Sequence, residues 1–214
     1  MLLLAVDTST PATSAAVSSV DGLLASVQHI AANRHGELLA PAVVEVLHAS
    51  GVALQDLDAV ACGVGPGPFT GLRVGVATAR SLGHALGIPV HGVCSLDALA
   101  YAHPRGAVVV ATDARRREVY WARYVDGVRV SGPAVATPAD VVAELRDQAF
   151  GGRLVGAGAE LYTSHFSEWP VVGGLPSAAA VGALAVAGQH LDPVPLYLRR
   201  PDAVVPGAPK KVLR

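Results

Sequence analysis

The segment Gly63-Val64-Gly65-Pro66-Gly67-Pro68-Phe69-Thr70-Gly71-Leu72-Arg73-Val74-Gly75 follows a short apolar run and precedes a stretch with helical periodicity. Its glycines and prolines cannot continue a central strand or a helix, so the chain must turn here. A loop at a helix N-terminus can present backbone N–H groups to an anion. The segment matches neither the Walker pattern nor the dinucleotide-binding fingerprint, and its two prolines remove two N–H donors. It therefore predicts a strand–loop–helix unit, with only a weak nucleotide-binding signal of its own.

The sequence around this unit predicts a mixed α/β sheet. Strand patterns occupy residues 2–6, 12–18, 23–30, 59–64 and 90–93, and helical patterns occupy 36–50, 70–86 and 96–101. The turn pair Asp21-Gly22 predicts a hairpin between the second and third strands. Pro41 predicts that the first helix starts near Ala40 or is kinked there. The order β-β-β-α-β-α-β-α implies a mixed five-stranded sheet with helices on its faces.

A second lobe is predicted after the turn Pro104-Arg105-Gly106. Strand patterns cover 107–111, 118–125 and 154–155, and helical patterns cover 138–146 and the alanine-rich residues 177–188. We therefore divide the chain into a first lobe, residues 1–103, and a smaller second lobe, residues 104–214, which ends in an extended tail.

Composition limits the classes of function. Of the 214 residues, 51% are hydrophobic and 15% are charged, which excludes global disorder. The formal net charge of −1 argues against a stand-alone nucleic-acid binder. Because the only lysines are Lys210 and Lys211, lysine chemistry is excluded from the first 209 residues. No signal peptide or membrane-spanning run is apparent, so we expect a cytoplasmic protein without membrane contact.

The chain shows no catalytic or metal-binding set. No two of its eight histidines are three or four residues apart, so no helix presents two imidazoles to a metal. The nucleophile-elbow motif of hydrolases is absent. Cys62 and Cys94 fit buried thiols in a reducing compartment better than a disulfide. We therefore assign no catalytic residue and no metal ligand.

Gly71, Gly75, Ala79 and Gly83 recur every four residues and form a ridge of small residues on one helix. Each glycine costs the helix up to about 1 kcal/mol relative to alanine, so a neighbour must approach closely. That neighbour is either the protein's own sheet or a partner helix, and the sequence favours neither.

Arg115, Arg116 and Arg117 stand together in a charged turn between two strands. A solvated hairpin tip is the default interpretation. Three adjacent arginines could also contact an acidic or phosphate-bearing partner.

Several segments, in order, resemble the TsaB (YeaZ) family. They are residues 4–10 (LAVDTST), 34–41 (RHGELLAP), 65–75 (GPGPFTGLRVG), 113–115 (DAR) with 119–121 (VYW), and 195–199 (PLYLR). Together they cover about residues 2–199, and the glycine–proline segment is the most specific. Relatives often carry a serine where this chain has Pro68, which weakens a direct nucleotide role for that loop.

The resemblance implies the two-lobed actin/sugar-kinase/Hsp70-like fold. It also implies a non-catalytic subunit that binds and activates a TsaD-type threonylcarbamoyltransferase. The complex would form threonylcarbamoyladenosine at position 37 of tRNAs that read codons starting with adenine. The implied partners are the TsaD-type paralogue, a TsaE-type ATPase and a second copy of the chain, with tRNA contacted only through the complex. No tightly bound cofactor is implied, and ATP or ADP would be held at the partner interface.

We place the partner interface on the two long helices of the first lobe. Its predicted residues are His35, Glu37, Leu38, Leu39, Val43, Gly71, Leu72, Arg73, Gly75, Val76, Ala79 and Arg80. The residues predicted to lie near any nucleotide are Asp7, Thr8, Ser9, Gly65, Gly67, Thr70, Gly156 and Gly158.

An autonomous ATP-binding or ATP-hydrolysing enzyme is the alternative function, with Asp7 beside the metal. Folds of this kind place a phosphate-contacting turn after the first strand, usually with a glycine where this chain has Ser9. The same residues also fit a local turn closed by the Asp7 side chain. A peptidase ranks lower, because neither a metal pair nor a Ser/Cys–His set is present. The sequence leaves open whether the isolated chain is a monomer or a homodimer.

Overall fold

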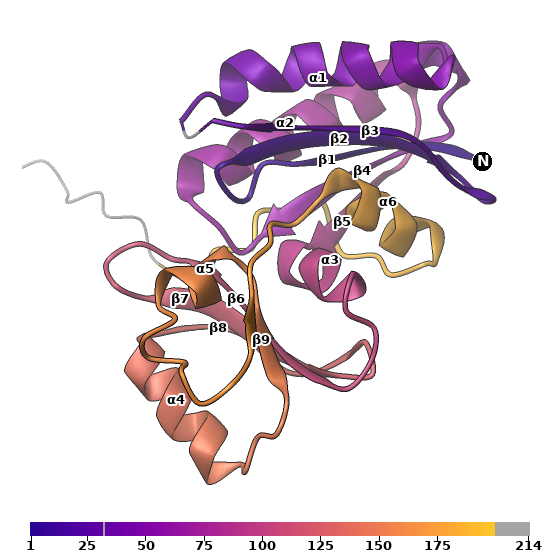
Figure 1. The fold of residues 1–214 in the computed structure, drawn as a ribbon. Helices are drawn as coiled ribbons and strands as arrows, with labels where there is room; N and C mark the ends of the chain where they lie inside the picture. The colour runs from indigo at the N-terminus through magenta and orange to yellow at the C-terminus, as the bar shows by residue number, and fades with distance from the viewer. Residues whose placement is uncertain (32, 200–214) are drawn as a thin grey trace, which may run out of the picture.

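Residues 1–31 and 33–199, which the computed structural model describes, form two five-stranded sheets with helices packed on their faces (Figure 1). The elements of the first half are β1 (Leu2–Asp7), β2 (Ala12–Ser19), β3 (Gly22–Ile30), α1 (His35–Ser50), a 3-10 turn (Leu54–Asp56), β4 (Ala59–Gly65), α2 (Phe69–Leu86), β5 (Val90–Cys94) and α3 (Ser95–Tyr101). Those of the second half are β6 (Ala107–Asp113), β7 (Val119–Val125), β8 (Val128–Ala136), α4 (Pro138–Asp147), β9 (Arg153–Val155), α5 (Ala157–Leu161), β10 (Val171–Val172) and α6 (Ala178–Val186).

The first sheet has the strand order β3-β2-β1-β4-β5. β1 pairs antiparallel with β2 and parallel with β4, so Leu4 lies opposite Val17 on one side and Val60 on the other. β2–β3 is the antiparallel hairpin expected from Asp21-Gly22, and β4–β5 is parallel. The prediction of a mixed five-stranded sheet is confirmed.

Both faces of the first sheet are covered by helices. Along β1 the side chains alternate between the faces, because successive residues of a strand point to opposite sides. Leu4 and Val6 pack against α1 and α2, whereas Leu3 and Ala5 pack against α3 and α6. β1 is therefore buried on both sides at the centre of the first lobe (Figure 1).

The first helix begins earlier than predicted. α1 starts at His35 and continues through Pro41, rather than starting near Ala40. Pro41 lies on the solvent side, where water can bind the carbonyl group that lacks an N–H donor. The apolar stripe of Leu39, Ala42 and Val46 on the opposite side holds the helix on the sheet.

The second sheet has the order β10-β9-β6-β7-β8, with β6–β9 and β9–β10 parallel and the other pairs antiparallel. α4 and α5 cover one face, and α3 covers the other. Because α3 also contacts the first sheet through Ala98, it forms a shared core between the lobes. The Tyr124 hydroxyl on β7 donates a 2.7 Å hydrogen bond to Asp97 of α3, which fixes this contact.

The chain returns to the first lobe at its end, which corrects the assignment of residues 104–214 to the second lobe. Val181 and Leu184 of α6 pack against Leu3 and Ala5, and Leu191 forms an antiparallel bridge with Gly92 of β5. α6 consists almost entirely of small apolar residues, so it fits a surface that is itself built from alanine. Apolar as it is, neither α6 nor any other helix among the described residues is long and apolar enough to cross a bilayer.

Candidate functional site

The turn Asp7-Thr8-Ser9-Thr10 lies at the edge of the first sheet where β1, β4 and β5 end. The Asp7 side chain closes a local turn, because its Oδ1 accepts hydrogen bonds from the Ser9 backbone N–H (2.9 Å) and from Ser9 Oγ (2.7 Å). Its Oδ2 accepts a third hydrogen bond, from Ser95 Oγ at 2.7 Å. Ser95 Oγ in turn accepts the Gly65 N–H at 3.2 Å. Asp7 thereby joins β1 to the first residue of α3 and to the glycine loop.

The Asp7 carboxylate has no open side. It is only 1% exposed, and a Cβ at Gly63 would overlap Oδ2, so the β4 backbone lies directly against it. Burial raises the pKa of the Asp7 carboxyl, while the hydrogen bonds from Ser95 and Ser9 oppose that rise. Among residues 1–31 and 33–199, no three His, Cys, Asp or Glu side chains are grouped so that they could hold a metal ion.

Thr8 joins the same turn to α2. Its hydroxyl donates to the Gly71 carbonyl (2.7 Å) and accepts the Gly75 N–H (3.1 Å). A Cβ at Gly75 would overlap Thr8 Oγ1, and one at Gly71 would lie 2.5 Å from the Thr8 carbonyl oxygen. Gly83 likewise lies against Val90. The neighbour of the small-residue ridge is therefore the protein's own first lobe and not a partner helix.

This packing changes the predicted partner interface. The interior of the first lobe contains Leu39, Val43, Gly71, Leu72, Gly75, Val76 and Ala79, which cannot contribute to an exposed face. Glu37, Arg73 and Arg80 are exposed, and Leu38 is half-buried. His35 is also half-buried and shares a 2.8 Å hydrogen bond between its Nδ1 and Thr13 Oγ1.

The predicted set leaves out several exposed residues on the outer side of the two helices. Ala40, Pro41 and Val44 of α1 and Ala77 of α2 are exposed. With α1 starting at His35, helical periodicity alone would have put Val44 outward, because it lies on the side opposite to Leu39 and Val46. Because Pro41 made the start of the first helix uncertain, the sequence did not show which of its residues face outward.

The residues predicted near a nucleotide come together at one end of the two sheets, but most are covered by neighbouring backbone. Gly67 lies against the Ser9 carbonyl, and Gly65 has a φ of +98°. Gly156 lies against the Ala111 carbonyl, and a Cβ at Gly158 would lie 2.6 Å from the Thr112 carbonyl carbon. Thr70 alone of the predicted set is exposed.

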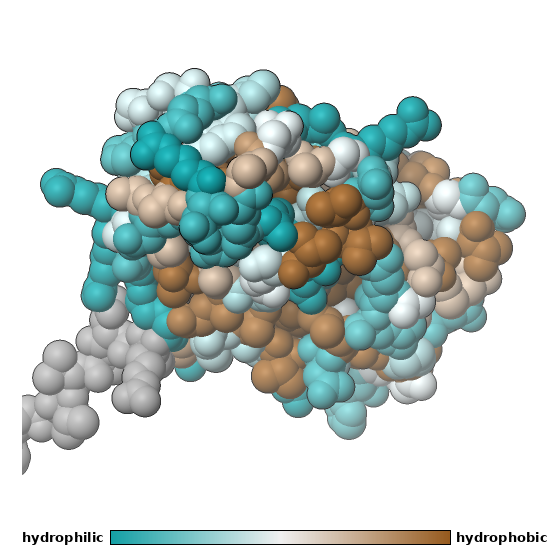
Figure 2. Space-filling view, turned by 90° about the horizontal axis from the view of Figure 1, so that it is seen from below, coloured by the Kyte–Doolittle hydropathy of each residue, from teal (hydrophilic) through white to brown (hydrophobic). Residues whose placement is uncertain are grey.

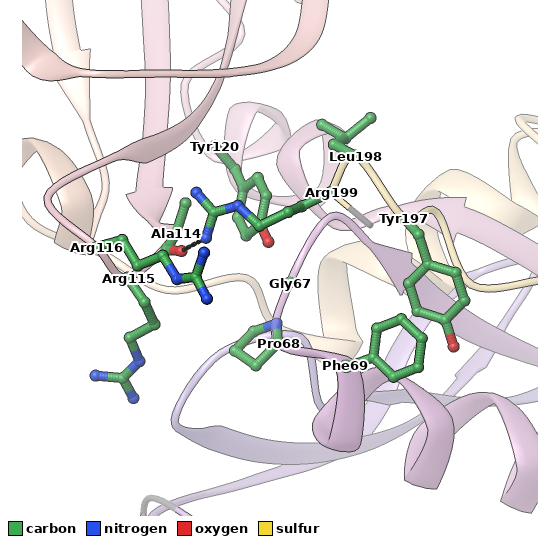
Figure 3. A pocket seen from close by; sticks show the side chains of 10 residues that line it. All are labelled: Gly67, Pro68, Phe69, Ala114, Arg115, Arg116, Tyr120, Tyr197, Leu198 and Arg199. Carbon is green, nitrogen blue, oxygen red and sulfur yellow. Dashed lines mark hydrogen bonds between the residues drawn. The ribbon is translucent and has the colours of Figure 1, made fainter. Parts of the chain in front are cut away.

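A cavity of about 350 Å³ opens between the lobes beside the glycine loop (Figure 3). It is lined by Gly67, Pro68, Phe69, Ala114, Arg115, Arg116, Tyr120, Tyr197, Leu198 and Arg199. The rings of Phe69 and Tyr197 are stacked with their centroids 4.1 Å apart. Arg73 Nε donates to the Tyr197 hydroxyl oxygen at 3.1 Å, and the Arg73 guanidinium lies 4.2 Å from the centre of the Phe69 ring.

Residues 195–199 connect the two lobes across this cavity. The Leu196 N–H donates to the Val64 carbonyl at 2.7 Å in the first lobe. Arg199 donates to the Ala114 carbonyl at 3.0 Å and forms an ion pair with Glu118 in the second lobe. The sequence motif PLYLR thus acts as a tie between the lobes, which its residues alone did not reveal.

Comparison with known proteins decides the family. A family model described as TsaD, tRNA N6-adenosine threonylcarbamoyltransferase, matches residues 25–189. A Haemophilus influenzae protein described as tRNA threonylcarbamoyladenosine biosynthesis protein TsaB is 34% identical over 93% of this chain and 94% of its own length. The chain belongs to the TsaB (YeaZ) family.

One similar protein has a solved structure, and another is much longer than this chain. A crystal structure from Pseudomonas aeruginosa, described as similar to peptidase YEAZ, shares 33% identity and a TM-score of 0.79 over 92% of this chain and 99% of its own. The two-lobed fold expected from the resemblance is confirmed. An uncharacterized Mycobacterium leprae protein is 47% identical over 94% of this chain, which spans only 56% of that protein.

Replacing Gly75 by alanine tests the contact between Thr8 and α2. Because the new methyl group would overlap Thr8 Oγ1, we expect Gly75→Ala to destabilise the protein by about 1–3 kcal/mol in urea unfolding. Gly36→Ala in α1 is the matched control, since a Cβ there meets nothing within 4 Å and should gain up to about 1 kcal/mol. An equal increase in the free energy of unfolding for both variants would contradict the close contact between Gly75 and Thr8.

The pH dependence of Asp7→Asn tests the buried carboxylate. The raised pKa means that, above the unfolded value of 3.8, the folded state binds the proton more tightly than the unfolded state. Wild-type stability from this group therefore falls as the pH rises through the folded pKa. We expect the free energy of unfolding of Asp7→Asn, relative to wild type, to increase from pH 4 towards neutral pH in denaturant titrations. A difference independent of pH would refute this reading.

Proposed function

We propose that this chain is the non-catalytic subunit that binds and activates a TsaD-type threonylcarbamoyltransferase in the formation of threonylcarbamoyladenosine in tRNA. The modified nucleoside would be at position 37 of tRNAs that read codons starting with adenine. The names of the family's members support the pathway. The observation that carries the non-catalytic role is the burial of the Asp7 carboxylate, which is 1% exposed and accepts hydrogen bonds from Ser9 and Ser95.

The Asp7 geometry disfavours the alternative, an autonomous ATP-dependent enzyme. An aspartate that holds a metal–phosphate group must offer an oxygen lone pair to the cleft. Here Ser9 and Ser95 donate to that carboxylate, and Gly63 closes its remaining side. The turn that would grip a nucleotide is instead part of the packed interior.

The surface best suited to the partner is the outer side of α1 and α2, which both cover the same face of the first sheet (Figure 1). Val44 is 68% exposed there, next to the exposed Pro41 on the same helix. Glu37 on α1 and Arg80 on α2 add exposed charges. An apolar centre with a charged rim is typical of protein interfaces. The TsaD-type paralogue, or a second copy of the chain, would dock there.

The remaining partners follow from assembly on this surface. ATP or ADP would be held at the interface that the two paralogues build together, and a TsaE-type ATPase would join the assembled pair. Neither role requires Asp7 to face solvent.

Val44→Asp tests the docking surface. We expect wild type to form a one-to-one complex with the TsaD-type paralogue from the same genome in light scattering. Because docking would bury the carboxylate that Val44→Asp introduces, the affinity of this variant for the paralogue should fall at least about tenfold. Val128→Asp on β8 is the matched control, because Val128 is 67% exposed but lies in the other lobe. Both variants should unfold within about 0.5 kcal/mol of wild type.

Two outcomes would overturn the proposal. One is a wild-type protein that forms no complex at any salt or nucleotide concentration. The other is a Val44→Asp complex as tight as that of wild type, which would move the interface off α1.

A further inference from the structure

β3 leaves one edge of the first sheet open. It is the outer strand in the order β3-β2-β1-β4-β5, and no strand among residues 1–31 and 33–199 pairs with its far side (Figure 1). The side chains of Ser26, Gln28 and Ile30 are exposed along this strand, that of Ile30 to 72%. An open edge carries backbone N–H and C=O groups that can pair with another strand.

The register with β2 shows which backbone groups of β3 are free. The Ala31 N–H donates to the Pro11 carbonyl at 3.1 Å, so these two residues form a hydrogen-bonded pair of the ladder. In an antiparallel ladder, hydrogen-bonded pairs alternate with pairs that share no hydrogen bond. Ala25, Val27 and His29 therefore direct their polar backbone groups to β2. The even positions 26, 28 and 30 direct theirs to the open edge.

The edge lacks the residues that normally prevent pairing. Over Gly22–Ile30, β3 contains no lysine, arginine, aspartate, glutamate or proline, although charges and prolines are common protections of an edge strand. A register shift opposite Val17 and Ser18 puts a bulge near Leu24. The strand is regular from there to its end, so residues 25–30 offer a continuous row of outward groups at alternate positions.

The side-chain pattern of β3 is symmetric about Val27. In an antiparallel pair of two β3 strands with Val27 opposite Val27, Ser26 lies opposite Gln28. Both are positions that direct N–H and C=O outward, so they can exchange hydrogen bonds across the new edge. In the same register the exposed apolar side chains, Leu24 at 47% and Ile30 at 72%, lie opposite each other. A shift by one residue would place outward groups opposite inward ones.

Charge does not oppose this pairing. His29 would lie opposite Ala25, a small apolar residue, and its ring already shares a 3.1 Å hydrogen bond with Glu45 of α1. No two like charges on β3 would therefore face each other across the edge.

We propose that the open edge of β3 binds a second copy of this chain through an antiparallel β3–β3 pair, which joins the first sheets of the two copies into one. Identical strands paired in this way are related by a two-fold axis, the commonest symmetry of soluble dimers. A strand of another protein could use the same backbone groups, but the symmetric pattern about Val27 favours an identical strand. Because one short strand pair buries a small area, the dimer should be weak and depend on concentration. The inference concerns the chain alone and does not rest on the proposed function.

The first test is amide hydrogen exchange measured by NMR, with light scattering, over a range of protein concentrations. In the monomer the Val27 N–H should be protected by β2, whereas those of Ser26 and Gln28 should exchange quickly. As the dimer forms, exchange at Ser26 and Gln28 should slow at least about tenfold. Slow exchange of these two amides in a monomer at every concentration would overturn the inference, because another part of the same chain would then cover the edge. Fast exchange in the concentrated protein would also overturn it.

Ser26→Lys tests whether the edge carries the dimer. It places a charge close to the same charge of the second copy, so the dissociation constant of the dimer should rise at least about tenfold. Ser164→Lys is the matched control, because Ser164 is exposed in the other lobe, and it should dimerise like wild type. Urea unfolding checks that both variants are folded. A dimer that persists in Ser26→Lys and is lost in Val44→Asp lies on α1 and contradicts the inference.

A single cysteine tests the register. Val27 would face its own copy at a position without hydrogen bonds, where Cα atoms are about 4.5 Å apart and a disulfide can form. Val27→Cys should therefore give a covalent dimer under mild oxidation, whereas Ser26→Cys, which faces Gln28, should not. The natural Cys62 and Cys94 are buried and should not compete. Cross-linking of Ser26→Cys but not of Val27→Cys, or of neither variant, would refute the proposed pairing.

Discussion

The buried turn after β1 is the constraint on which the rest of the first lobe depends. Asp7 binds Ser9 and Ser95, and Thr8 binds the backbone of α2 at Gly71 and Gly75. Three elements that are distant in sequence are thus held at one point, with every polar atom of the turn's two side chains paired. Such a network is stable only when complete, because a buried polar group without a partner costs about 1–3 kcal/mol. The glycines of α2 and β4 have no side chain, and this leaves room for the atoms of Asp7 and Thr8.

The turn after β1 is a packed joint between three elements of the first lobe. The position that would face a ligand is occupied by serine hydroxyl groups and by the β4 backbone at Gly63. The outer side of α1 and α2 and the cavity between the lobes are the nearby surfaces that are open to solvent. Separate apolar patches also interrupt the hydrophilic surface seen from below (Figure 2).

The sequence predicted the first sheet well, because β1 and β4 are apolar runs and the Asp21-Gly22 turn marks the hairpin of β2 and β3. It could not orient the small-residue ridge, since closely spaced glycines mark a near neighbour without saying which one. The Asp7–Ser95 bond joins residues 88 positions apart, beyond the reach of local patterns. The return of α6 was missed for a similar reason, because an alanine-rich helix has no polar face to show which surface it covers. The boundary between residues 103 and 104 stays a prediction.

The position of α6 affects how the protein can fold while it is being synthesised. Its partners Leu3 and Ala5 leave the ribosome first, and α6 follows the end of β5 by more than 80 residues. At a synthesis rate of roughly 5–20 residues per second, one face of the first sheet stays uncovered by α6 for about 4–17 s. During that interval an apolar surface is available to chaperones or to neighbouring nascent chains. The second lobe, whose strands and helices are contiguous in sequence, can fold in the meantime, so the lobe made first is the lobe completed last.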